Sequence, residues 1–339
     1  MSGRGSARLA EALLRLVLEE EDGIAPLGAV EWTGIARIGI RNAVLIRCTD
    51  RLSGRGAEPP PATADLVRRE RERARAMLDA MQAVATQCRA LGVGFLYPRA
   101  LQHLPDMGRD LDLLLLSCST EVDARLRAEL HAVPLPAGLR GRIGGSTSYR
   151  LPGCPAVLDV QHGRLGVVGE HKTFPAALLR RRRPRTVAGR TFDVPSEEDQ
   201  LLLQGMLRVY GRTALRLSDI ASTILLLRSH SVDWDYVIRT ARELAILPGL
   251  SCYLTYVDQI HAGALGGRLP CPDVARRLLS QSWGRVRFEG DEYRFPAAAV
   301  NCRLYLQRLA TDLRSRRWSS AGRLGLIPAV AGAALCGRA

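Results

Sequence analysis

The feature that most constrains this chain is the run RDLDLLLLS, Arg109 to Ser117, in which two acidic residues open a segment that contains five leucines. A short apolar run of this kind predicts a strand that is buried in a sheet. Side chains alternate between the two faces of a strand, so Asp110 and Asp112 point to the same side, roughly 6.5–7 Å apart at their Cα atoms. Two like charges beside a core repel each other and stay ionised only if a positive group lies between them.

A divalent cation would meet that requirement, because Mg²⁺ takes oxygen ligands and also holds substrate phosphates. Asp159 supplies a third acid inside the apolar segment AVLDVQHG, residues 156–163, which predicts a second strand. Two metals that share a carboxylate would hold both sides of an in-line phosphoryl displacement. We therefore predict that Asp110, Asp112 and Asp159 bind Mg²⁺ or Mn²⁺. The alternative for the pair is that Asp110 caps a loop or pairs with Arg109 while Asp112 lies at a solvated edge.

The pattern along the chain predicts an α+β fold with a mixed sheet flanked by helices. We expect an N-terminal helical section with a linker over residues 1–64, a catalytic core over residues 65–195 and a helical C-terminal domain over residues 196–339. Three prolines place the linker at residues 53–64, because such a stretch cannot hold a helix. A charged helix over residues 65–91 leads into the core.

Further strands are predicted on either side of the acidic run. The segment GVGFLYP, residues 92–98, is a short buried-strand candidate. Residues 148–163 form two strands that are joined by a turn at Pro152 and Gly153. His162 lies three residues after Asp159, so in a strand it faces the other side, where a structural role is expected.

Helix starts in the last section are predicted from short polar residues. Ser196 and Asp199 form a capping pair before an apolar run. Asp219 and Asp233 open two further predicted helices, and capping of the helix N-terminus accounts for both.

The net charge of +14 raises the question of an anionic partner. Lys172 is the sole lysine, so 47 of the 48 cationic residues are arginine. The arginine-rich run over residues 180–186 predicts a solvated loop rather than an arm that binds nucleic acid. It is not interleaved with aromatic residues, which make up 5% of the chain, so bases have few surfaces on which to stack.

The cysteines and the chain ends favour a cytoplasmic protein without membrane insertion. The eight cysteines form neither a CxxC pair nor a Cys/His cluster with zinc spacing. Residues 1–22 lack the apolar centre of a signal peptide. Residues 324–339 are too short and too rich in Ala and Gly to span a bilayer, and we expect a packed terminal helix there.

The acidic run resembles the signature of the nucleotidyltransferase superfamily that includes DNA polymerase beta and the aminoglycoside nucleotidyltransferases. More closely, the chain is similar to a poorly characterised bacterial branch, the nucleotidyltransferase-like family, over about residues 65–265. Four segments carry this resemblance: Arg109 to Leu114, Leu158 to His162, Ser218 to Ala221, and Asp233 with Trp234.

The resemblance implies a mixed sheet with flanking helices, Mg²⁺ at Asp110, Asp112 and Asp159, and transfer of a nucleoside monophosphate from an NTP, ATP by default. The implied acceptor is a small molecule, a sugar or a peptide. Two alternatives stay open: an RNA acceptor, which the net charge and Arg180 to Arg185 favour, and a non-catalytic relic that binds a nucleotide or a partner.

One departure from the superfamily pattern concerns the triphosphate. The superfamily has a Gly-Ser turn some 9–13 residues before the first aspartate, whereas this chain has YPRAL at residues 97–101. Arg99 could replace the turn by bidentate contact with phosphate. We predict that Arg99, Arg109 and Lys172 contact the nucleotide, with Lys172 as a compact phosphate contact or a general base; chance retention of one lysine is the alternative. The missing turn favours the relic, and GGSTS at residues 144–148 follows the first two acids.

Overall fold

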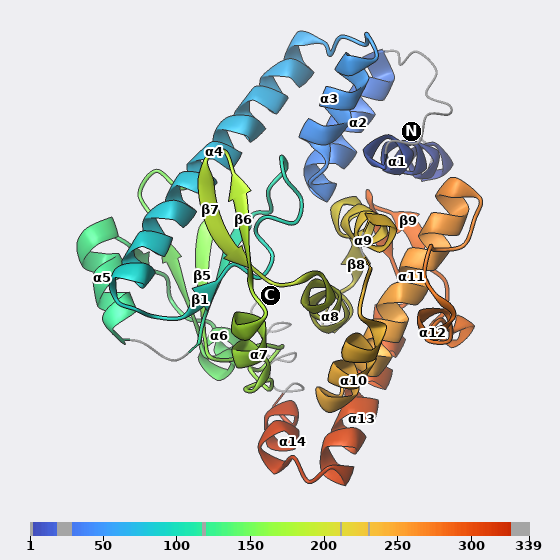
Figure 1. Cartoon of the computed structure of the whole chain (residues 1–339). Coiled ribbons are helices and arrows are strands. Elements are labelled where there is room, and N and C mark those ends of the chain that lie inside the picture. Colours follow the sequence, from blue (N-terminus) through green and yellow to red (C-terminus); the bar gives the residue numbers. More distant parts are fainter. Residues whose placement is uncertain (1–2, 19–28, 117–119, 211, 230, 327–339) are drawn as a thin grey trace.

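The structure is built around a mixed sheet with helices on both faces, which confirms the α+β fold class (Figure 1). It is a computed structural model that describes residues 3–18, 29–116, 120–210, 212–229 and 231–326. The strand order is β1-β2-β5-β4-β3. Strands β2 and β5 are parallel, and the other neighbouring pairs are antiparallel. The bounds are β1 (Phe95–Leu96), β2 (Asp110–Leu115), β5 (Val157–His162), β4 (Ser146–Arg150) and β3 (Val133–Pro134).

The predicted strands around the acidic run are therefore present. The two strands predicted within residues 148–163 are β4 and β5, and their turn contains Gly153 with a φ of +71°. A positive φ suits glycine because it has no Cβ that would clash in the left-handed region.

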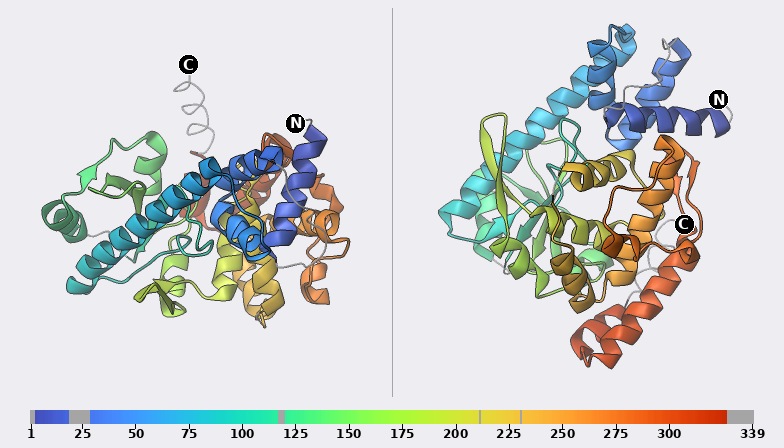
Figure 2. Two further views of the ribbon diagram at one scale, coloured as in Figure 1. Left: turned by 90° about the horizontal axis from the view of Figure 1, so that it is seen from above. Right: turned by 45° about the vertical axis from the view of Figure 1, so that its right-hand side comes forward.

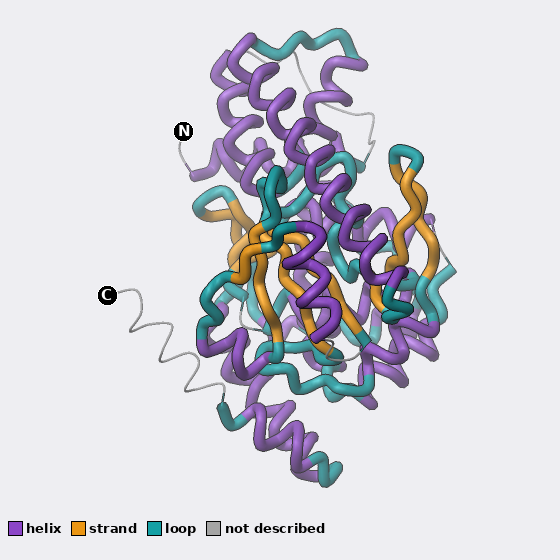
Figure 3. The backbone as a smooth tube through the Cα atoms, turned by 90° about the vertical axis from the view of Figure 1, so that its left-hand side faces the viewer, coloured by secondary structure: helices purple, strands orange, loops and turns teal. Residues whose placement is uncertain are grey.

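Alternation along β2 sends its side chains into two different environments. Leu111, Leu113 and Leu115 enter a buried cluster with helices α4 (Pro61–Ala90) and α5 (Thr120–Leu130). Figure 3 turns this side toward the viewer, with the strands behind the helices. The opposite face of β2 begins with the two acids and ends at Leu114, which joins the other large cluster. The strand thus carries its acids on the face that α4 does not cover.

Helix α4 begins earlier than the sequence predicts. Pro61 occupies its first turn, where proline is tolerated because the missing N–H would have had no partner in the helix. The preceding helix α3 (Leu45–Gly54) also reaches into the expected linker. The prediction of a linker over residues 53–64 is therefore wrong at both ends, and the connection is residues 55–60.

The N-terminal helices pack against the last section of the chain. Helix α1 (Gly3–Val17) contacts α9 (Leu217–Ser229) and α11 (Leu247–Leu265), and Figure 2 shows it beside them. Leu13 of α1 shares one apolar cluster with Tyr253 of α11. The predicted division at residues 64 and 195 stays a prediction. The remaining helices are α2 (Ala29–Asn42), α6 (Leu139–Gly144), α7 (Phe174–Arg180), α8 (Glu197–Leu207), α10 (Trp234–Glu243), α12 (Asp273–Arg276), η1 (Gln281–Trp283), α13 (Ala297–Arg314) and α14 (Trp318–Leu324).

Two smaller sheets were not predicted. The arginine-rich run that was expected to be a loop forms the end of α7 and strand β6, which pairs with β7; Ala188 and Gly189 in the turn both have positive φ. The last section contains a three-stranded sheet in the order β8-β10-β9. The bounds are β6 (Arg183–Val187), β7 (Arg190–Val194), β8 (Ala214–Leu215), β9 (Arg287–Glu289) and β10 (Glu292–Arg294).

Two of the predicted helix caps are confirmed. The Ser196 hydroxyl accepts a hydrogen bond from the backbone N–H of Asp199 at 3.3 Å, and the Asp233 carboxylate accepts one from Tyr236 at 2.9 Å. No helix in the described part of the chain is long and apolar enough to cross a bilayer. A packed helix was expected over residues 324–339, but residues 327–339 lie outside the described part of the chain.

A buried ion pair joins α13 to the segment after β5. Arg308 donates to the Glu170 carboxylate at 2.7 Å and to Nε2 of His171 at 2.6 Å. Both Arg308 and Glu170 are buried. Burial, and then the charges of Arg308 and Arg317, lower the pKa of His171 well below its ordinary value.

Replacing Arg308 with methionine should lower the free energy of unfolding by about 3 kcal/mol, because the buried Glu170 carboxylate keeps its hydrogen bonds from the backbone of Val167 and Val168 but loses its cation. Urea unfolding followed by circular dichroism measures the change. Arg314→Met, at an exposed position near the end of the same helix, is the matched control and should cost less than about 0.5 kcal/mol. An equally small loss for Arg308→Met would show that the pair does not stabilise the fold.

The free energy of unfolding should fall as the pH drops below about 6.5. His171 stays neutral in the folded protein while the unfolded imidazole binds a proton, so this group contributes a loss of up to about 1.4 kcal/mol per pH unit. His171→Gln should reduce that slope. His131→Asn is the control, because His131 is exposed and asparagine tolerates its φ of +50°; its slope should match that of the wild type. An unchanged slope in His171→Gln would contradict the assignment.

Candidate active site

Parallel pairing of β2 with β5 brings the three predicted acids to one place. The register sets Asp112 directly opposite Asp159, with Asp110 two residues earlier on β2. Neighbouring strands lie about 4.8 Å apart, and equivalent positions on paired strands share a face. Leu158 and Val160, which flank Asp159, enter the cluster under α4, so Asp159 lies on the opposite face together with Asp110 and Asp112. The structure thus places the acids as the sequence predicts; their role stays a prediction.

Asp112 is buried and forms an ion pair with Arg99. Nη2 of Arg99 lies 2.6 Å from Oδ1 of Asp112. Burial alone would lower the pKa of Arg99, but the Asp112 carboxylate, followed by Asp219 and Asp110, outweighs burial and raises that pKa above its ordinary value. Arg99 lies in the loop after β1, so the positive group required beside the two acids comes from the chain itself.

Asp159 is half-buried and accepts a hydrogen bond from the Ser148 hydroxyl. Ser148 is its partner on the adjacent strand β4. Burial raises the pKa of Asp159, and the charges of Asp112 and Asp110 raise it further, while Ser148 and Arg99 act in the opposite direction. A carboxylate with a raised pKa accepts a proton more readily, which suits a general base.

The predicted metal can be tested against this arrangement. Carboxylate oxygens are the donors that Mg²⁺ prefers. Nevertheless, among the residues that the structure describes, no three His, Cys, Asp or Glu side chains are grouped so that they could hold a metal ion. Arg99 engages Asp112 and Ser148 engages Asp159. In this arrangement the three acids therefore do not fit a metal site, and a cation would have to displace Arg99 from Asp112.

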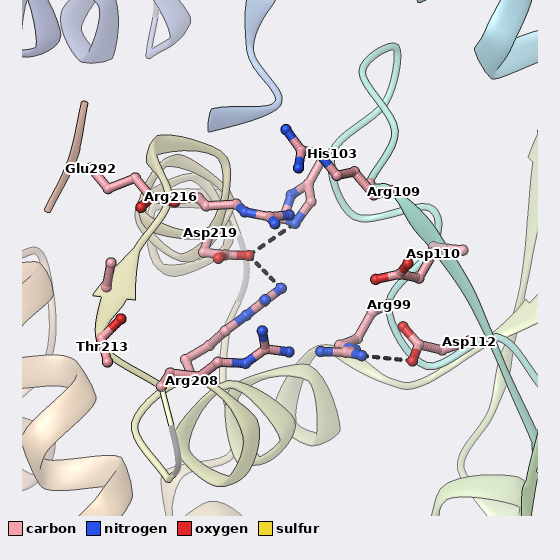
Figure 4. A pocket seen from close by; sticks show the side chains of 14 residues that line it. Arg99, His103, Arg109, Asp110, Asp112, Arg208, Thr213, Arg216, Asp219 and Glu292 are labelled. Carbon is pink, nitrogen blue, oxygen red and sulfur yellow. Dashed lines mark hydrogen bonds and ion pairs between the residues drawn. The ribbon is translucent and has the colours of Figure 1, made fainter. Parts of the chain in front are cut away.

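A cavity on one side of the acids is lined by arginines, which we call the arginine cleft: Arg99, Arg109, Arg208, Arg212 and Arg216. Asp110 and Asp112 form one wall, and the opposite wall comes from the end of α8 and the start of α9 (Figure 4). Arg208, just after α8, is partly buried, with 12% of its side chain exposed. Burial lowers its pKa, and the nearby charges of Arg99 and Arg216 lower it further, against the opposing effect of Asp219.

Asp219 holds the far wall of this cleft together, which corrects its predicted role as a helix cap. Its Oδ1 lies 2.5 Å from Nη2 of Arg208 and 3.0 Å from Nε2 of His103. It lies inside α9 and is fully buried. Burial alone would raise the pKa of Asp219, but Arg208 and His103 hold it well below its ordinary range. The ionised Asp219 carboxylate thus holds Arg208 and His103 in place and does not cap the helix.

A second cavity borders the same acids on the side of β4 and β5. Its lining includes Ser146, Ser148, Gln161 and Arg164, together with three glycines of the segment before β4. Asp110, Asp112 and Arg99 line both cavities. The acids therefore stand between a cationic cleft and a polar cavity that offers hydroxyl and amide groups.

The structure separates the other two predicted nucleotide contacts. Arg109 is exposed and lines the arginine cleft beside Asp110. Lys172 is exposed in a different cavity, next to the start of α14, where its Nζ donates to the Ser319 hydroxyl at 3.2 Å. The structure therefore does not bring Lys172 together with the acids.

Sequence reasoning missed Ser148, Arg208 and the structural role of His103. The turn at Gly153 could have revealed Ser148, because antiparallel pairing back from that turn aligns it with Asp159. His162 was predicted to have a structural role, and its Nε2 lies 3.3 Å from Oγ1 of Thr147. Arg208 and His103 carry no local pattern that marks them.

Comparison with known proteins adds little beyond the fold. No protein-family model matches the chain, and no curated protein sequence matches it. Among solved structures, the chain is similar to the crystal structure of an antigenic nucleotidyltransferase-like protein from Paracoccidioides brasiliensis, with 16% sequence identity and a TM-score of 0.38. The match covers 58% of this chain and 94% of that chain. This is a distant likeness of fold, and it assigns neither a family nor an activity.

Replacing Arg99 with alanine should lower the free energy of unfolding by about 3 kcal/mol, because the buried Asp112 charge loses its partner. Millimolar Mg²⁺ or Mn²⁺ should then raise the melting temperature of Arg99→Ala more than that of the wild type, since a cation no longer competes with the guanidinium. Differential scanning fluorimetry with and without metal measures both effects.

The double variant Arg99→Ala/Asp112→Asn is the control, because it removes the Asp112 charge as well as the Arg99 charge. It should recover part of the lost stability and lose the response to metal. If Arg99→Ala and this double variant respond to metal alike, the acids do not bind the cation.

Proposed function

We propose that the protein transfers a nucleoside monophosphate from an NTP to an acceptor hydroxyl. The observation that carries this proposal is the register of β2 and β5, which puts Asp112 opposite Asp159 on one face of the sheet. Asp110 and Asp112 line the arginine cleft, and Asp159 lines the second cavity beside it. Acids that could activate a nucleophile therefore stand beside cations that could hold phosphates, and phosphoryl transfer needs both.

In the proposed reaction the acceptor oxygen attacks the α-phosphorus of the NTP. A new bond forms between that oxygen and phosphorus, the bond from phosphorus to the bridging oxygen of the β-phosphate breaks, and pyrophosphate leaves. The hydroxyl proton passes to the Asp159 carboxylate, whose pKa is raised by burial and by its acidic neighbours. Arg99 and Arg109 lie where they could stabilise the negative charge that develops on the phosphates.

The two cavities suggest how the substrates are divided. The triphosphate would occupy the arginine cleft, and the acceptor would occupy the second cavity, where Ser146, Ser148 and Gln161 offer hydrogen bonds. Such a lining suits a small molecule, a sugar or a peptide. ATP is the default nucleotide. The dependence on Mg²⁺ or Mn²⁺ stays a prediction, and the metal titration of Arg99→Ala tests it.

An RNA acceptor has less support from the described residues. The arginine-rich run was considered as a contact for RNA, but three of its arginines form ion pairs with acids of the protein. These pairs are Arg181 with Glu198, Arg182 with Asp193 and Arg183 with Glu197. The non-catalytic relic has one observation in its favour, because Arg99 already engages Asp112.

Asp112→Asn should lower the rate of transfer roughly 10²–10³-fold, because the amide keeps the shape of the side chain and removes its charge. The assay combines the purified protein, each α-³²P-labelled NTP, Mg²⁺ or Mn²⁺ and a fractionated cell extract, and it measures label in a new product. Circular dichroism checks that the variant stays folded.

Asp235→Asn is the matched control, since Asp235 is exposed in the first turn of α10; its rate should equal that of the wild type. Transfer that survives in Asp112→Asn would rule out a catalytic role for the acids. A product that ribonuclease degrades would favour the RNA alternative. Binding of NTP without any transfer by the wild type would favour the relic.

A further inference from the structure

The arginine cleft gathers more positive charge than its own acids balance. The described residues that line it include five arginines and four acids, Asp110, Asp112, Asp219 and Glu292. Glu292 also pairs with Arg41, which lies outside the cleft, at 3.0 Å. The charge that remains is therefore positive. An anion that enters the cleft would relieve repulsion among the guanidinium groups.

The cleft also has a fixed far wall. Asp219 binds Arg208 and His103 through the same oxygen, and His103 in turn lies 3.0 Å from the Ser222 hydroxyl. Figure 4 shows the Arg208 side chain directed at Asp219 on the far wall and the Arg99 side chain directed at Asp112 on the sheet wall. Because Asp219 is fully buried, solvent screens its charge little, and it restricts the position of Arg208 strongly.

We propose that the arginine cleft binds a polyphosphate chain without a metal ion, and that Asp219 is the positioning residue that holds Arg208 for this purpose. The inference deepens the proposed function and rests on it for the identity of the ligand, the triphosphate of an NTP. Guanidinium groups bind phosphate oxygens in a bidentate manner and carry their charge at every relevant pH.

A chain of phosphates fits this arrangement better than a single phosphate. The five arginines come from separate segments. Arg99 and Arg109 lie in the loop between β1 and β2, Arg208 and Arg212 lie between α8 and β8, and Arg216 lies in the turn before α9. One phosphate group has three or four free oxygens, too few for bidentate contact with every one of these guanidinium groups, whereas a triphosphate offers more oxygens along its length. Asp110 and Asp112 would repel the chain at the sheet wall, so its terminal phosphates would lie toward Arg208 and Arg216.

The test measures binding of inorganic tripolyphosphate and pyrophosphate to the full-length protein in EDTA, by isothermal titration calorimetry. The wild type should bind tripolyphosphate, and pyrophosphate more weakly. Arg216→Met should weaken tripolyphosphate binding roughly ten- to hundredfold, the effect of losing a charge-assisted contact. Arg242→Met is the matched control, because it removes the same charge from an exposed position on α10 outside the cleft. It should bind like the wild type.

Asp219→Asn distinguishes the effect of Asp219 on the position of Arg208 from its effect on the net charge of the cleft. Removing a negative charge from the cleft would tighten anion binding if only net charge mattered, whereas a loss of order at Arg208 weakens it. We expect weaker binding, with circular dichroism confirming the fold; if this variant does not fold, Arg216→Met still decides the site. Tighter binding in folded Asp219→Asn would overturn the positioning role.

The cleft itself would be overturned by absence of binding in EDTA, by unchanged binding in Arg216→Met, or by an equal loss in Arg242→Met. These outcomes are independent of the transfer assay, because the binding measurement contains neither an acceptor nor a nucleoside. Failure of transfer with intact tripolyphosphate binding would remove the proposed function and leave the anion site. Nucleotidyl transfer by a protein that does not bind tripolyphosphate in EDTA would keep the proposed function and remove the metal-independent anion site.

Discussion

The parallel pairing of β2 with β5 decides where the chemistry of this protein can lie. Because the two strands run in the same direction and in register, Asp112 and Asp159 become neighbours although 46 positions separate them in the chain. The same alternation that buries Leu111 and Leu113 under α4 directs the acids to the other face. A shift of one residue in this pairing would bury the acids and expose the leucines, so the apolar core and the candidate site specify the same register.

Arg99 links this sheet to the helical section that faces it. It pairs with Asp112 on β2, and its pKa also responds to Asp219 of α9. The site therefore contains two ion pairs, one on each wall, with the guanidinium groups of Arg99 and Arg208 between the carboxylates. Buried ion pairs add little net stability, because desolvation offsets much of the attraction. Their retention at the centre of a cleft is better explained by placement of charge than by stability.

The sequence predicted those parts of the site that depend on local pattern. Asp110 and Asp112 stand out because two carboxylates rarely open a strand of leucines, and the turn at Gly153 revealed the adjacent strands. The capping serine before α8 was also visible, since its partner lies three residues away.

The parts that could not be predicted depend on distant contacts. Asp219 resembles a helix cap in sequence, yet its partners are Arg208 and His103 on other segments. Strand β6 was not predicted, because its arginine-rich sequence shows no alternation of apolar and polar residues. Its conformation is stabilised by pairing with β7. Local propensity has no access to such interactions.

The packing of α1 against α9 and α11 has a consequence for how the chain acquires its structure. The first helix leaves the ribosome long before the helices that cover it, so Leu13 and its apolar neighbours stay uncovered while the whole sheet is synthesised. Contacts between such distant segments slow folding, because a long loop must close before they form. Chaperone binding to the nascent α1 segment would suit a protein in which helices from distant parts of the sequence complete the same core.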